Sequence, residues 1–185
     1  MTQPAIAATQ AWLEKAVIGL NLCPFAKAVH LRRQIRYVLS EATDEQALLA
    51  DLMGELEHLS QADAEALDTT LLIHPGVLTD FLDFNDFLGL ADAAVAALGL
   101  EGEIQVASFH PQYQFAGTDP GDIENFSNRA PYPTLHLLRE SSIERALAAS
   151  ADAAGIYERN IQTLQKLGPT GWRELFADGA PTQRE

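Results

Sequence analysis

The sequence has little of several things that would point to a particular class of protein. Cys23 is its only cysteine, so no disulfide can form within the chain. No segment approaches the roughly 20 uninterrupted apolar residues that span a bilayer, and the N-terminus lacks the basic and apolar regions of a secretory signal. These absences predict a cytoplasmic protein in a reducing compartment that has no membrane partner.

The sequence signatures of several common site types are also absent. The chain shows no zinc-ligand spacing, no phosphate-loop glycines, no dinucleotide-binding fingerprint and no serine nucleophile elbow. The sequence therefore predicts no particular cofactor.

Positive charge is missing from the middle of the chain. No Lys or Arg occurs between Tyr37 and Asn128, and the formal net charge is −14. Such an acidic chain would repel a phosphate backbone, which excludes bulk nucleic-acid binding. The cations gather early in the chain and return late, at Lys15, Lys27, Arg32, Arg33, Arg36, Arg129 and Arg139. If these two parts of the chain meet, they form a basic patch for an anionic ligand; otherwise the cations pair with the acidic block.

The patterns that are present indicate one globular domain over residues 1–177 and a flexible tail at 178–185. Apolar and β-branched runs predict strands at 34–40, 68–75, 103–110 and 133–139. Helical spacing predicts helices at about 5–18, 24–31, 44–60, 80–97, 141–149 and 151–167. Four of them are expected to be capped by Cys23, Thr43, Thr79 and Ser141, and a further helical turn is expected at Asp119-Pro120. This order predicts an α/β (or α+β) fold, with a single mixed sheet of about four strands flanked by about six helices. The fourth strand could run in either direction.

Two of the strands end in the same pair of residues. His74-Pro75 follows the second strand and His110-Pro111 follows the third. Proline cannot donate to a strand ladder, so each strand is expected to end at its histidine. If these strands are parallel and adjacent, both imidazoles lie at the carboxyl edge of the sheet, where α/β folds place ligands. There they could share a substrate as catalytic groups, or a metal as ligands. The alternative is that each ring bonds the local backbone.

A long loop from 111 to 132 follows His110 and carries polar and aromatic groups. Tyr113 and Asn128 could orient a ligand, and Arg129 could bind a carboxylate or phosphate through its planar guanidinium. Arg32, Arg33 or Arg139 could assist it. The alternative is that Arg129 pairs with Asp119 or Asp122 and holds the loop shut.

Cys23 is a separate candidate for chemistry. At a helix N-terminus, with Lys27 one turn on, its thiol would favour thiolate and could act as a nucleophile or a peroxide sensor. A dithiol mechanism is excluded within one chain, because there is no second cysteine. The alternative is a small buried apolar side chain.

Four stretches resemble a known family: WLEKAVIGLNLCPFAK, TTLLIHPGVLTDFLDFNDFL, IQVASFHPQYQFAGT and NRAPYPTLHLLRE. Together they run from about Ala11 to Trp172 and resemble a bacterial family catalogued as domain of unknown function 1415. The resemblance implies a small, stand-alone bacterial protein and no particular activity.

The residues leave three hypotheses open. The first is an enzyme or binding protein for a small anionic molecule at the carboxyl edge of the strands, using His74, His110 and Arg129. The second is a thiol protein that acts through Cys23. The third is a non-catalytic binding or assembly protein, which could form a homodimer.

Overall fold

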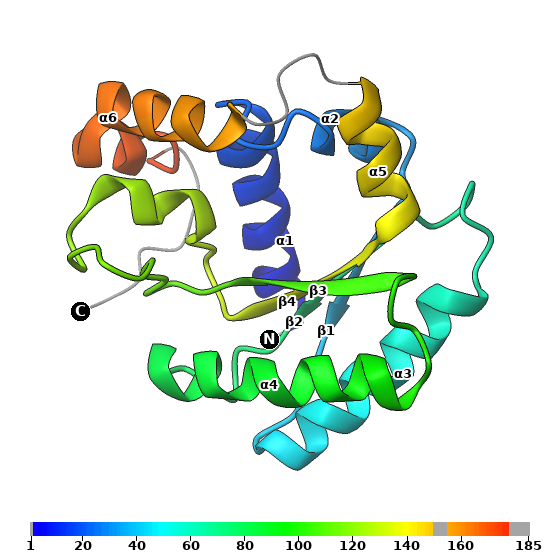
Figure 1. The fold of residues 1–185 in the computed structure, drawn as a ribbon. Coiled ribbons are helices and arrows are strands. Elements are labelled where there is room, and N and C mark those ends of the chain that lie inside the picture. Colours follow the sequence, from blue (N-terminus) through cyan, green and yellow to red (C-terminus); the bar gives the residue numbers. More distant parts are fainter. Residues whose placement is uncertain (1, 150–154, 178–185) are drawn as a thin grey trace.

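A computed structural model describes residues 2–149 and 155–177, and the tail predicted at 178–185 lies outside them. Within this part of the chain, one four-stranded mixed sheet has helices on both faces (Figure 1). The α/β interpretation of the sequence is therefore confirmed.

The sheet consists of β1 (Ile35–Leu39), β2 (Thr69–Ile73), β3 (Ile104–Phe109) and β4 (Thr134–Arg139), in the order β1-β2-β4-β3. β1 and β2 are parallel, whereas β4 is antiparallel to β2 and to β3. The two strands that end in histidine therefore run in the same direction. They are not adjacent, as the sequence had suggested they could be, because β4 lies between them.

Two helices, α3 (Glu45–Gln61) and α4 (Phe81–Ala97), cover one face of the sheet and form the lower layer in Figure 1. Leucines of α3 and aromatic residues of α4 pack there against Leu72, Leu135 and Leu137 of the sheet. The Asp44 carboxylate accepts the N–H of Ala47 and caps α3, and the Asp80 carboxylate accepts the N–H of Leu82 and caps α4.

The predicted caps, Thr43 and Thr79, are therefore wrong by one residue. Aspartate and threonine both cap helices well, so a Thr-Asp pair does not show which of the two is the cap.

The upper layer contains α1 (Thr2–Trp12), the π-helical η1 (Leu13–Ile18), α2 (Ala26–Leu31), the 3₁₀-helical η2 (Ile123–Asn128), α5 (Glu140–Ala149) and α6 (Ile156–Glu174) (Figure 1). Its core is built around Trp12 and Val17, against which Tyr37 and Phe109 of the sheet pack.

In α6 the backbone of Gly168 leaves the helical region, at φ 66°, just before Pro169. The sequence predicted that this helix stops there, and the structure has a kink instead.

Three predicted helix starts in this layer are also wrong. α2 is capped by Phe25, so Cys23 lies outside the helix. η2 is capped by Asp122, not by Asp119. α5 begins at Glu140, directly after β4, so Ser141 lies inside it.

Candidate functional site

His74 and His110 lie at the same edge of the sheet, on either side of Pro133. The backbone N–H of His74 donates to the carbonyl of Pro133, and that of His110 donates to the carbonyl of Asn128. Both side chains are fully buried, and both rings contact Phe84 of α4, at centroid distances of 5.7 and 5.0 Å. The fold therefore brings the two histidines to one neighbourhood beneath the sheet.

Both imidazoles bond the loop that follows β2. Nδ1 of His74 donates to the carbonyl of Val77 at 3.0 Å, and Nε2 of His110 donates to the carbonyl of Leu78 at 3.2 Å. Nδ1 of His110 accepts the N–H of Gln112, which assigns the neutral tautomer to that ring. Leu78 has a φ of 55°, a left-handed conformation that costs free energy in a leucine. The two histidines hold this strained turn in place.

Burial keeps both rings neutral. It lowers the pKa of His74 to about 4 and also lowers the pKa of His110, because a charged imidazolium would lose its hydration. Nε2 of His74 has no hydrogen-bond partner within the described residues. Neither ring is exposed, so in this conformation the histidines support a wall and do not themselves meet solvent.

The outer side of the same turn lines a pocket of about 580 Å³ between the N-termini of α3 and α4. Its walls come from the loops after β1 and β2, and they consist of Thr43, Asp44, Glu45, Gln46, Val77, Leu78, Thr79, Asp80 and Asp83. The carboxyl edge of parallel strands is where α/β folds place ligands, and this volume is typical of small-molecule sites. The sequence predicted this edge as a place for ligands but indicated Thr43 and Thr79 only as helix caps.

The pocket lining is acidic. Oδ1 of Asp44 and Oδ1 of Asp80 accept the capping N–H groups, and within the described residues their Oδ2 atoms have no hydrogen bond. Glu45 and Asp83 add two more carboxylates, and no Lys or Arg lines the pocket. No three His, Cys, Asp or Glu residues in the described chain are grouped so that they could hold a metal ion.

Arg129 and Asn128 lie near this edge but bond the protein itself. Nε and Nη2 of Arg129 donate to the carbonyls of Tyr113 and Pro120, and its guanidinium lies 4.4 Å from the Phe126 ring centroid. Burial lowers the pKa of Arg129. The Asn128 amide donates to the carbonyl of Ser108. The loop is thus held shut, although Arg129 bonds carbonyls and not the aspartates that the sequence suggested.

Asn125, which the sequence interpretation did not single out, is the buried centre of this loop. Its Oδ1 accepts the N–H of Phe115 and the hydroxyl of Thr118, and its Nδ2 donates to the carbonyl of Asp119. An asparagine in a polar loop gives no sequence signal of such a role.

The remaining predicted site residues lie elsewhere. Arg139, at the last position of β4, donates to the carbonyls of Leu59 and Ala62 at the C-terminal end of α3 and to the carbonyl of Leu67 just before β2. Arg32 and Arg33 are exposed between α2 and β1. These three arginines lie at the amino end of β1 and β2, so the fold does not bring them to Arg129.

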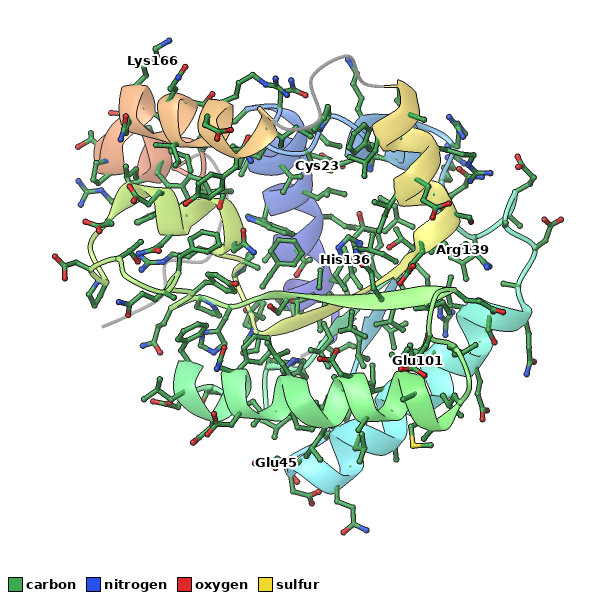
Figure 2. All side chains as sticks on the ribbon, viewed as in Figure 1. Cys23, Glu45, Glu101, His136, Arg139 and Lys166 are labelled. Atoms are coloured by element: carbon green, nitrogen blue, oxygen red, sulfur yellow. The ribbon has the colours of Figure 1, made fainter. Side chains whose placement is uncertain are left out.

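Cys23 and His136 lie on the upper side of the sheet (Figure 2). Cys23 is half-buried and packs against the Trp12 core. Nε2 of His136 donates to the hydroxyl of Thr69 at 2.7 Å, and burial lowers the pKa of His136 to about 4. His136 is therefore a hydrogen-bonded histidine of the sheet face. The sheet separates both residues from His74 and His110.

A family model described as "Protein of unknown function (DUF1415)" matches residues 4–174, which confirms the resemblance seen in the sequence. No curated protein and no solved structure matches the chain. Among the described helices, none combines the length and apolar content needed to cross a bilayer.

Proposed function

Since the chain belongs to the DUF1415 family of unknown function, we propose its function from its geometry: it binds a small organic cation in the pocket between α3 and α4. The observation that carries this proposal is the uncompensated charge of the pocket. Asp44, Glu45, Asp80 and Asp83 line it, and no cation of the chain does. The positive ends of two helix dipoles offset only part of that charge.

An ammonium or guanidinium group fits the donors and acceptors that the pocket offers. The free Oδ2 atoms of Asp44 and Asp80 can each accept a charge-assisted hydrogen bond. Thr43 and Thr79 are exposed beside them, and their hydroxyls can donate or accept. A ligand that carries two cationic groups would engage both walls.

The geometry favours a cation over the anion that the sequence predicted. Two of the four arginines expected to bind an anion already donate to main-chain carbonyls, Arg129 to two and Arg139 to three, and Arg32 and Arg33 lie at the opposite end of β1 and β2. The proposed roles of His74 and His110 change accordingly, because they fix the turn that forms one wall and do not contact the ligand.

Titration calorimetry with 1,4-diaminobutane and with agmatine tests the proposal, and inorganic phosphate serves as the anionic probe. We expect saturable binding of at least one amine and none of phosphate. The double variant Asp44→Asn/Asp80→Asn keeps both helix caps, because asparagine caps as well as aspartate. It should weaken amine binding about tenfold or more, since each charge-assisted bond contributes about 1.5–3 kcal/mol.

Asp86→Asn is the matched control, because Asp86 is an exposed acid of α4 outside the pocket lining. It should bind the amine as the wild type does. The absence of amine binding up to millimolar concentration, or equal affinity in the double variant, would show that the pocket has another role.

A further inference from the structure

α4 carries apolar residues on its outward side as well as on its buried side. Leu82, Gly89, Ala93 and Ala97 recur at helical spacing and are exposed. Leu82 is 71% exposed, and neighbouring Leu90 is 45% exposed. A Cβ added at Gly89 would meet no atom within 4 Å. Exposed apolar residues that follow one side of a helix mark an interaction surface, so this outward stripe indicates a partner.

The stripe has an acidic rim. Asp83, Asp86 and Asp92 are exposed on the same helix, and neither α3 nor α4 contains a Lys or Arg. A surface that covers the stripe must therefore bring an apolar side chain with cations around it.

α2 offers such a surface. Leu31 is 70% exposed, and Lys27, Arg32 and Arg33 around it are exposed as well. Within the described residues, none of these three cations makes an ion pair or a side-chain hydrogen bond. The apolar Leu31 matches the apolar residues of the α4 stripe, and the three cations around it match the acidic rim of that stripe.

We propose that copies of this chain associate head to tail, with the α2 surface of one copy on the α4 stripe of the next. α2 lies in the upper layer and α4 in the lower layer, on opposite sides of the sheet (Figure 1). The contact therefore joins unlike surfaces. After two copies associate, one α2 surface and one α4 stripe remain uncovered, so further copies can add. A nucleic acid or an anionic membrane could take the α2 surface, but would leave the acidic, apolar α4 stripe uncovered. A second copy covers both.

Sedimentation of the full chain tests this. The average mass should rise with protein concentration, and the rise should weaken at high salt, which screens the charges. Arg32→Glu/Arg33→Glu and Asp86→Lys/Asp92→Lys should each remain monomeric alone. Their equimolar mixture should associate and keep growing as the wild type does, because the intact α2 surface meets the intact α4 stripe and the introduced glutamates meet the introduced lysines. Lys166→Glu/Arg173→Glu on α6 is the charge-matched control and should associate as the wild type does.

Three results would overturn the proposal. A wild type that stays monomeric at every concentration removes the contact. Undiminished association of Arg32→Glu/Arg33→Glu would mean that α4 pairs with α4 or with another surface. A mixture that stays monomeric would show that α2 and α4 do not meet. None of the substituted residues lines the pocket between α3 and α4, so the test does not depend on amine binding.

Discussion

His74 donates from Nδ1 to the carbonyl of Val77, and Phe84 stacks against its ring. Its pKa of about 4 in the folded protein compares with 6.5 for an ordinary histidine, because burial disfavours the charged form. Between these values the unfolded chain binds a proton that the folded chain does not. The contribution of His74 to stability is therefore complete above about pH 6.5 and is lost as the pH falls toward 4.

The variant His74→Asn isolates this effect. Its amide can donate to Val77 but does not titrate, so the loss of stability between pH 7 and pH 5 should shrink by about 2 kcal/mol relative to the wild type. Urea denaturation at the two pH values measures it. His58→Asn, on the exposed side of α3, is the control and should keep the wild-type difference. Identical pH dependence in His74→Asn and the wild type would contradict the prediction.

The hydrogen bonds of Arg129 can be tested separately from its positive charge. Arg129→Lys keeps the cation but loses the planar fork that reaches the carbonyls of Tyr113 and Pro120 together. Losing one charge-assisted bond should lower the free energy of unfolding by about 2 kcal/mol. Chemical denaturation checks this against Arg32→Lys, an exposed site where we expect a change within about 0.5 kcal/mol. A loss no larger than that of the control would argue against the structural role.

At the scale of the elements, Gly76 sets how closely the two pocket loops approach. A Cβ at Gly76 would lie 2.9 Å from the carbonyl oxygen of Ala42, which is too close for two backbones to absorb without shifting. The loops after β1 and β2 therefore approach so closely at this position that only glycine fits without a shift of the backbone.

Gly76→Ala should lower the free energy of unfolding by about 1–3 kcal/mol, because it forces the loops apart. Gly54→Ala is the matched control inside α3, where an added Cβ meets no atom within 4 Å. It should raise stability by up to about 1 kcal/mol, since alanine favours the helix. Thermal unfolding of both variants measures the contrast. A neutral Gly76→Ala would mean that the loops can separate at little cost.

Most elements could be predicted from the sequence because apolar periodicity reports burial directly. The pocket could not be predicted, because Thr43 and Thr79 become neighbours only through the pairing of β1 with β2. The separation of His74 from His110 was also beyond the sequence, since a loop of about twenty residues lets β4 lie beside β2 or outside β3. The sequence did allow the prediction that both histidines end parallel strands. They therefore lie at the same edge of the sheet.

At the scale of the whole molecule, charge is divided between the layers. α3 and α4 carry acids without any Lys or Arg, whereas Lys15, Lys27, Arg145 and Lys166 lie in the upper layer. Few cations lie close enough to compensate the acids of α3 and α4. One that does is Arg36 of β1, which forms an ion pair with Glu55 of α3. Like charges within one layer repel and oppose folding.

Salt should therefore stabilise this protein. We expect the melting temperature to rise as sodium chloride increases from about 20 mM to about 500 mM, where the Debye length falls well below 10 Å. Asp86→Lys/Asp92→Lys should show a smaller rise, because it removes part of the repulsion. Calorimetry at low protein concentration keeps this effect apart from self-association. A melting temperature that falls with salt would indicate that attractive pairs dominate.

The position of β4 has a consequence for how the chain reaches its fold. β4 lies between β2 and β3 but follows both of them in the chain. During synthesis, β2 and β3 leave the ribosome while the strand that must separate them is still being made. In that interval each presents an unpaired edge, and the β2-α4-β3 segment could close as an ordinary parallel unit, with the wrong neighbour. The native sheet can form only once residues 134–139 have emerged and entered between strands that arrived first.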